Sequence, residues 1–154
     1  APSKSFNIAG LATSNLIIPN PDLRRAVSAH IPAQPTFMGY RACQGAYERA
    51  ESWLDACIRV VGENARYVKK FLAEKLPWVR LSPLQGTYLL WADFTKAGLS
   101  KEELEQRMHS QALYLDEGYI FGKEGEGFER INLACPASVI HSAMNRMYEA
   151  LKDL

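Results

Sequence analysis

Apolar residues recur at intervals of three and four along residues 36–76, which is the longest regular pattern in the chain. This spacing places apolar side chains on one face of an α-helix. About forty residues is long for a single helix, so we expect two helices with a break near Gly45 or Glu51. Pro77 cannot continue a helix and ends the second one.

After Pro77 the pattern changes to short apolar and aromatic segments separated by polar ones. Ser100 followed by Glu103 forms a capping box, which begins a helix that reaches about Gln111. In chain order we expect strands at residues 78–81 and 86–94, the capped helix, a strand at 113–115, a glycine-rich hairpin connection at 118–127, a strand at 128–133 and a helix at 137–151. This alternation predicts an α/β fold, an α+β sandwich in which helices cover a small antiparallel or mixed sheet.

The first 35 residues show a weaker pattern. The elements expected there are a short extended segment that carries Lys4, a strand at residues 16–18, and a helix from Asp22 to His30 that Pro32 and Pro35 terminate. One strand and one helix cannot bury their apolar faces alone. We therefore expect residues 1–45 to be the remnant of a larger domain, residues 46–76 to form a connecting helix, and residues 77–154 to form a small C-terminal domain.

Composition narrows the classes of function. The chain is 47% hydrophobic and 23% charged, which is ordinary for a globular domain. It has 18 basic and 17 acidic side chains, so it lacks the surplus of basic residues that nucleic-acid binding needs. No run of about 18 apolar residues predicts a membrane span. Three widely spaced cysteines favour free thiols and a cytoplasmic location. None of them has metal-ligand spacing to the three histidines, so no metal site is expected.

Three segments carry a resemblance to a known family. They are residues 3–11 (SKSFNIAGL), residues 85–91 (QGTYLLW) and residues 121–136, which contain the Phe121-Gly122 pair and the run FERINLACP. Their order and spacing are similar to those of the fold-type-I pyridoxal-phosphate (PLP) enzymes of the class I/II aminotransferase superfamily. The nearest branch is that of the cystathionine β-lyase-like carbon–sulfur (C–S) lyases. The resemblance covers essentially all 154 residues, but only the C-terminal portion of the family's usual chain.

The resemblance implies a role for three residues. Lys4 would form the Schiff base with PLP and remove the Cα proton of an amino-acid substrate, and Arg130 would bind the substrate α-carboxylate. Ser3 would contact the cofactor phosphate. Where many relatives have a phosphate-binding serine and arginine, this chain has Ala1 and Ala12. Most of the phosphate contact is therefore expected from other parts of the enzyme or from a partner subunit, since the family builds its site at a homodimer interface.

Elementary chemistry is consistent with these roles but does not require them. A partly desolvated lysine amine can add to an aldehyde, and a planar guanidinium offers two parallel donors to a carboxylate. Arg130 stands in an otherwise apolar strand, where an unpaired charge is unfavourable. The alternatives are a solvated lysine near a chain terminus and a surface-facing arginine on a strand.

Two interpretations of function remain. In the first, the chain is part of a PLP-dependent aminotransferase or C–S β-lyase, whose isolated C-terminal portion is expected to be inactive. In the second, it is a catalytically silent domain that folds and self-associates. Lys4 serves both transamination and β-elimination, so the sequence does not distinguish lyase from transaminase.

Overall fold

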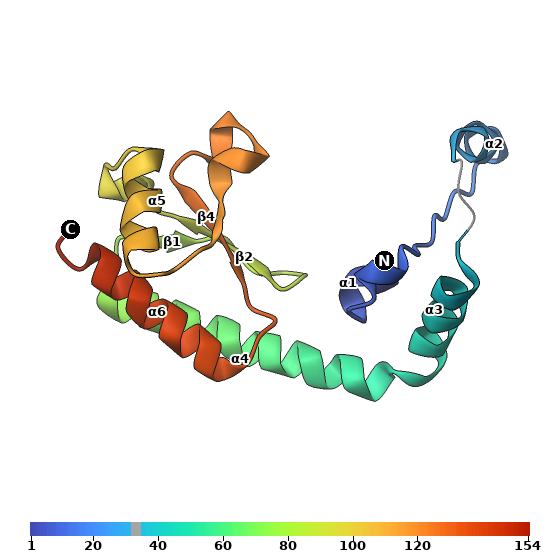
Figure 1. Cartoon of the computed structure of the whole chain (residues 1–154), viewed down its shortest axis with the longest axis horizontal. Helices are drawn as coiled ribbons and strands as arrows, with labels where there is room; N and C mark the ends of the chain where they lie inside the picture. The colour runs from blue at the N-terminus through green and yellow to red at the C-terminus, as the bar shows by residue number, and fades with distance from the viewer. Residues whose placement is uncertain (32–34) are drawn as a thin grey trace. The chain divides into compact units, whose positions relative to one another are not determined.

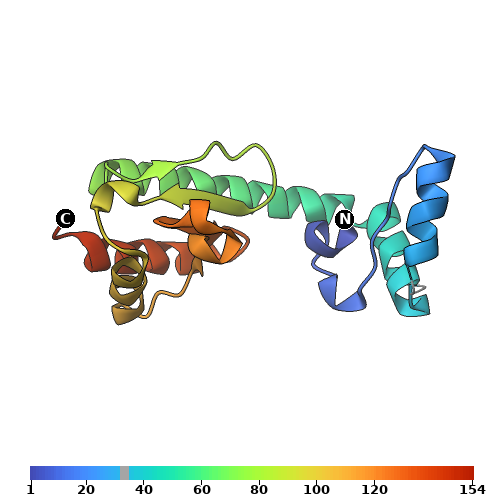
Figure 2. The same cartoon turned by 90° about the horizontal axis from the view of Figure 1, so that it is seen from above.

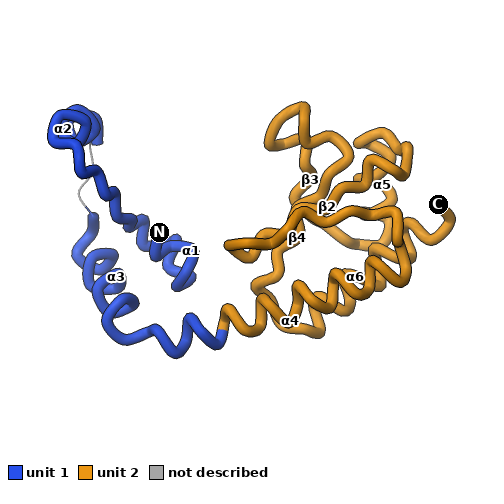
Figure 3. The backbone as a smooth tube through the Cα atoms, turned by 180° about the vertical axis from the view of Figure 1, so that it is seen from behind, with its two compact units in different colours: residues 1–56 blue, residues 57–154 orange. Residues whose placement is uncertain are grey.

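The computed structural model of the chain describes residues 1–31 and 35–154. The chain forms two compact units, Ala1–Ala56 and Cys57–Leu154, which Figure 3 colours separately. The domain boundaries expected after residues 45 and 76 stay predictions. Throughout the described residues, every helix is too short or too polar to cross a membrane.

The first unit is built from helices, which are blue to cyan in Figure 1. They are α1 (Pro2–Ser5), the 3-10 turn η1 (Ala9–Leu11), α2 (Pro21–His30), α3 (Phe37–Arg49) and the first residues of α4 (Glu51–Lys75). The expectation of an extended segment around Lys4 is wrong, because Lys4 lies in α1. Pro2 suits the first helical turn, and the Phe6 N–H closes that turn on the Pro2 carbonyl at 2.9 Å.

The strand expected at residues 16–18 is also wrong. This segment is irregular, and Leu16 and Ile17 are 65% and 89% exposed. Within the described part of the chain, the only sheet is formed by strands that follow residue 79, so the segment has no strand to pair with. An apolar run alone does not make a strand, because its backbone groups need a hydrogen-bonded neighbour.

The helix expected from Asp22 to His30 is present as α2. Its cap is Asn20, whose Oδ1 accepts hydrogen bonds from the N–H groups of Asp22 at 3.0 Å and Leu23 at 2.9 Å. Asp22 lies in the first turn, as expected. The terminating role expected of Pro32 falls outside the described residues.

The two long helices expected over residues 36–76 are confirmed as α3 and α4. They meet at Ala50, beside the expected break at Glu51. Thr36 caps α3 through its Oγ1, which accepts a hydrogen bond from the Gly39 N–H at 3.0 Å. Helix α4 ends at Lys75, two residues before Pro77.

The second unit is built on a four-stranded antiparallel sheet with the order β1-β2-β4-β3, seen from two sides in Figures 1 and 2. The strands are β1 (Arg80–Leu81), β2 (Leu89–Asp93), β3 (Asp116–Glu117) and β4 (Phe128–Asn132). Helices α5 (Lys101–Ser110) and α6 (Ala137–Leu151) complete the unit. The α+β fold class expected from the sequence is confirmed, and Ser100 and Glu103 form the expected capping box of α5.

The strand expected at residues 113–115 is wrong. Ala112 has a positive φ of 52° and ends α5, and the Leu113 N–H donates to the Met108 carbonyl at 3.1 Å. The backbone at this point therefore closes a helix, and Leu113 is buried in the core. The sheet strand begins only at Asp116.

The glycine-rich segment joins β3 to β4, as expected of a hairpin connection. Its backbone is closely packed. A Cβ on Gly118 would lie 2.2 Å from the Gly125 carbonyl oxygen, and one on Gly125 would lie 2.1 Å from that of Gly118. These glycines are therefore required by contact between backbones.

Helices α4, α5 and α6 cover one face of the sheet. Figures 1 and 3 show α4 beside α6, and the rings of Tyr67 and His141 meet with centroids 4.0 Å apart. The inward side chains of the sheet and helices form one apolar core, which includes Leu90, Ala92, Ile131, Val68, Leu72, Leu104, Met108, Ile140, Met144 and Leu151. The opposite face of the sheet carries Trp91 and Arg130.

The carboxyl group of Glu129 lies on the covered face. Glu129 is 3% exposed, and its Oε2 has no hydrogen-bond partner among the described residues. Burial, followed by the charges of Glu117, Glu105 and Asp116, raises the pKa of Glu129 to about 8.

Candidate functional site

Lys4 presents its side chain to solvent on the short helix α1. Among the residues that the structure describes, its amine has no ion-pair or hydrogen-bond partner. Its Nζ is therefore available to react as a nucleophile or to carry a proton.

The segment that carries Lys4 is fixed by Phe6. The Phe6 ring stacks on Trp53 with centroids 6.4 Å apart and meets the Tyr47 ring edge-on at 5.7 Å. Aromatic contacts of this kind stabilise a local arrangement by about 1 kcal/mol. A short helix that could not persist alone is in this way held against α3 and the start of α4.

The chain that follows α1 is held where the backbone of α3 approaches it closely at Gly39. A Cβ on Gly39 would lie 2.1 Å from Thr13 Oγ1 and 2.7 Å from the Leu11 carbonyl oxygen. Only glycine allows α3 to pack this closely on the chain that follows η1.

Ser3 is the direct neighbour of Lys4 in α1 and is half-buried. Ala12, where the family pattern has an arginine, adopts a left-handed conformation with φ of 49°. This region of the first unit therefore offers the Lys4 amine and, beside it, the half-buried Ser3 hydroxyl. That donor set fits a covalently held aldehyde cofactor with at most one direct phosphate contact from Ser3.

Arg130 lies in β4 of the second unit and is paired with an acidic residue. Its Nε and Nη2 donate to Asp116 Oδ2 at 3.0 and 2.8 Å, and the two residues lie opposite each other in the register of β3 and β4. The Arg130 side chain is 29% exposed. Asp116 occupies one edge of the guanidinium, and the edge formed by Nη1 and Nη2 still has N–H groups for a second carboxylate.

An aromatic ring lies against the Arg130 guanidinium. Its Cζ lies 4.3 Å from the centroid of the Phe121 ring, and Trp91 is its partner across β2 and β4. Trp91 in turn stacks on Phe128 with centroids 5.7 Å apart. A guanidinium held over a ring keeps its plane fixed, and the apolar surroundings strengthen its attraction for an anion.

Asp116 and Phe121 were not predicted from the sequence as neighbours of Arg130. Asp116 was missed because the strand was expected three residues too early, at 113–115. A signal was available in the sequence, since Asp116 and Glu117 are acidic and opposite charges paired across two strands stabilise a sheet. The roles of Lys4 and Ser3 in the first unit, and of Arg130 in the second, stay predictions.

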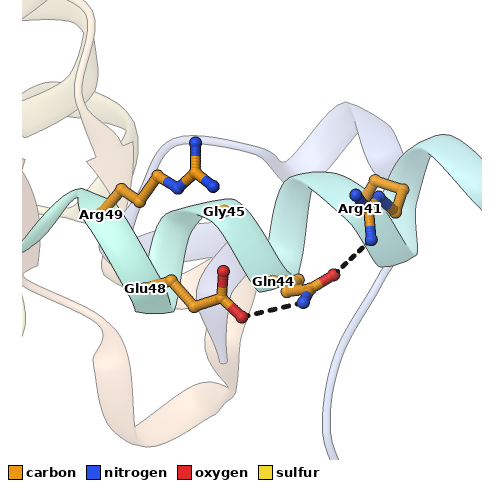
Figure 4. A pocket seen from close by; sticks show the side chains of 5 residues that line it. All are labelled: Arg41, Gln44, Gly45, Glu48 and Arg49. Atoms are coloured by element: carbon orange, nitrogen blue, oxygen red, sulfur yellow. Dashed lines mark hydrogen bonds between the residues drawn. The ribbon is translucent and has the colours of Figure 1, made fainter.

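A separate surface hollow of about 260 Å³ lies on α3, shown in Figure 4. Gln44 accepts a hydrogen bond from Arg41 Nη1 at 2.7 Å and donates one to Glu48 Oε1 at 2.8 Å. The hollow is lined by one face of one helix and includes none of the three predicted site residues. We assign it no part in the site.

Comparison with known proteins shows which enzymes the chain resembles. The chain is 36% identical over 156 residues to cystathionine β-lyase PatB of Bacillus subtilis, and the match covers 98% of this chain and 40% of that protein. The chain is therefore similar in sequence to the cystathionine β-lyases. Aminotransferases also match it, at lower identity. No family model matches the chain.

Two solved structures share the fold of this chain. Cystalysin from Treponema denticola, whose crystal structure contains a pyridoxal 5'-phosphate cofactor, is 45% identical with a TM-score of 0.91 and covers 99% of this chain and 40% of that chain. A PLP-bound C–S lyase from Staphylococcus hominis, in the external aldimine form with the inhibitor L-cycloserine, is 30% identical with a TM-score of 0.88 and the same two coverages, 99% and 40%. The chain thus spans about 40% of the length of the proteins it matches.

Proposed function

We propose that this chain supplies the catalytic lysine and the substrate-binding arginine of a PLP-dependent enzyme that acts on amino acids, either a C–S β-lyase or an aminotransferase. The observation that supports this most strongly is the match of nearly the whole chain to crystal structures that hold PLP. The free amine of Lys4 and the open edge of Arg130 are consistent with it.

Each residue has a distinct task in this proposal. When bound, PLP supplies an electron-withdrawing ring that stabilises negative charge at the substrate Cα. Lys4 would hold the cofactor through its amine, and as a free amine its Nζ would take the Cα proton of the substrate. Arg130 binds the substrate α-carboxylate through its Nη1/Nη2 edge, while Asp116 and Phe121 keep the guanidinium in place.

The lyase and aminotransferase activities differ in what leaves the substrate. A lyase expels a β-thiolate and produces pyruvate and ammonia, whereas an aminotransferase returns the proton and passes the amino group to a keto acid. Lys4 serves both outcomes. Release of pyruvate and thiol from cystathionine would support the lyase, and keto-acid-dependent amino transfer would support the aminotransferase.

We further propose that the active enzyme is a cytoplasmic homodimer. The three free thiols, Cys43, Cys57 and Cys135, are consistent with a reducing compartment. Exposed apolar side chains in the first unit, among them Phe37 at 76% and Met38 at 67%, are consistent with an association surface. Light scattering that gives twice the mass of the polypeptide would support the dimer.

The direct test of the proposed function is covalent labelling of Lys4. The chain is incubated with PLP, the linkage is reduced with borohydride, and the labelled peptide is found by mass spectrometry. We expect preferential labelling of Lys4 and its loss in Lys4→Ala. The matched control, Lys70→Ala, removes an exposed lysine of α4 that pairs with Glu74 and should leave the label in place.

Even labelling of all lysines would contradict the assignment of Lys4. Because α1 is short and Lys4 is exposed, we expect weak binding and no turnover by the chain alone. Turnover of an amino acid by the 154-residue chain would contradict that part of the proposal.

A further inference from the structure

A cluster of ligand-type side chains lies in the second unit, on the face of the sheet that the helices cover. Glu105 and His109 are one turn apart on α5, and Glu117 comes from β3. One nitrogen of His109 and one oxygen from each glutamate all lie within 4.8 Å of one another. His109 stands between the carboxylates, with Nδ1 3.9 Å from Glu105 Oε1 and Nε2 3.5 Å from Glu117 Oε1.

A second observation is independent of this cluster. Glu129 faces Glu117 in the register of β3 and β4, and residues paired in this way project to the same face of a sheet. Glu129 is 3% exposed, and its Oε2 has no hydrogen-bond partner among the described residues. A buried carboxylate oxygen without a donor is rare in native proteins, and a cation would supply the missing partner.

The surroundings of the cluster leave the negative charge largely uncompensated. Tyr119 donates its hydroxyl to Glu105 Oε2 at 2.9 Å, which orients that carboxylate and leaves its other oxygen toward His109. Within the described part of the chain, His109 is the only basic side chain that pairs with Glu105 or Glu117. The side chains of Glu105, His109 and Glu117 are 31%, 35% and 18% exposed, so an ion can reach them from solvent.

We propose that Glu105, His109 and Glu117 bind a divalent transition-metal ion of the Zn²⁺ type, with the Glu129 carboxyl facing it from the buried side. An imidazole nitrogen combined with carboxylate oxygens favours ions such as Zn²⁺ over Mg²⁺ or Ca²⁺, which prefer oxygen ligands alone. Bonds of about 2.0–2.1 Å in a tetrahedral site hold ligand atoms about 3.4 Å apart. His109 Nε2 and Glu117 Oε1 already have nearly this separation, and one oxygen of Glu105 lies within 4.8 Å of the other ligand atoms.

The site does not depend on the proposed PLP chemistry. It is formed by α5, β3 and β4, with Glu129 on the face of β4 opposite to that of its neighbour Arg130. Cysteine and histidine spacing in the sequence predicted no metal site. Such spacing does not reveal a set in which one histidine is joined by a carboxylate of its own helix and a carboxylate of a strand.

The test is a Zn²⁺ titration of the full 154-residue chain against a chromophoric chelator, with Co²⁺ absorption as a report of nitrogen and oxygen ligation. We expect one saturable site. His109→Ala and Glu117→Gln should each weaken Zn²⁺ binding at least 10-fold, and Glu129→Gln should weaken it by about 10-fold as the loss of a supporting contact. Mg²⁺ at the same concentration should not compete.

Matched controls separate this site from other Zn²⁺ ligands. His30→Ala removes an exposed histidine of α2, and Glu74→Gln removes an exposed carboxylate of α4; both should bind Zn²⁺ like the unsubstituted chain. Circular dichroism without metal shows whether each variant is folded. If His109→Ala does not fold, His109→Asn is used in its place. The absence of a one-to-one site, or equal affinity in folded His109 and Glu117 variants, would overturn the proposal, since Zn²⁺ would then be bound by the thiols or not at all.

Discussion

At the scale of single residues, neighbouring groups decide what each ionisable side chain does. Asp93, at the end of β2, accepts hydrogen bonds on Oδ1 from the Thr95 N–H at 2.9 Å and the Thr95 hydroxyl at 2.6 Å. Arg80 forms an ion pair with it at 3.2 Å. Burial alone would raise the pKa of Asp93, but these bonds and the Arg80 charge outweigh it and hold the pKa below its ordinary value.

The lowered pKa predicts how stability depends on pH. A carboxyl group whose pKa is lower in the folded state stabilises the fold above its unfolded pKa, and this contribution is lost as the pH falls through the folded pKa. We expect Asp93→Asn to lower the free energy of unfolding at pH 7 by about 1 kcal/mol. The difference should shrink below about pH 4.

Urea unfolding at several pH values measures this difference. Asp55→Asn, at an exposed position of α4, is the control and should change little. An Asp93→Asn effect of the same size at pH 3 and pH 7 would contradict the argument.

At the scale of elements, one buried amide joins α4 to the end of β4. Asn64 is 2% exposed, and its Nδ2 donates to the carbonyls of Leu133 and Cys135, both at 2.9 Å. These carbonyls lie where the chain leaves the sheet toward α6 and has no strand neighbour to bond with. Asn64 therefore fixes the packing of a helix on a sheet through polar contacts inside an apolar core.

We expect Asn64→Ala to lower the free energy of unfolding by about 2 kcal/mol, because two buried acceptors lose their donors. Chemical denaturation, followed through the unfolding transition of the second unit, measures this change in free energy. Glu63→Gln, at the exposed neighbouring position, should have an effect below about 0.5 kcal/mol. A nearly neutral Asn64→Ala would show that water replaces the amide.

At the scale of the whole molecule, buried apolar groups are unevenly divided between the two units. The main core, with 17 buried apolar residues, belongs entirely to the second unit. Among the described residues of the first unit, the buried apolar side chains are those of Pro2 and Cys43. Burial of apolar area is the main source of stability, so the first unit has the weaker support.

We expect backbone amides of residues 1–31 and 35–49 to exchange with deuterium faster than those of β2, β4 and α6. Hydrogen exchange followed by mass spectrometry measures this difference, and limited proteolysis should cut the irregular segment at residues 13–19 first. Exchange in urea provides the fully unfolded reference. Equal protection of the two units would show that the chain unfolds as one cooperative body.

The sequence by itself determined the elements whose cause is local. The α5 capping box, the α3 and α4 pattern and the limits of α6 depend on residues within a few turns of each other. Three ordered motifs likewise carried the resemblance to the enzymes that the chain matches. Only the tertiary structure decided which segments pair. It left residues 16–18 without a strand, moved the strand from 113–115 to Asp116 and placed Asp116 beside Arg130.

The same division applies to the candidate sites. Lys4 and Arg130 could be recognised because motifs lie along the chain, whereas the Glu105–His109–Glu117 cluster joins a helix to a strand. The spacing of apolar residues predicts on which face of a helix or strand a side chain lies, but not which element packs against that face. Strand register and helix packing bring residues far apart in the sequence together, and these depend on the whole core.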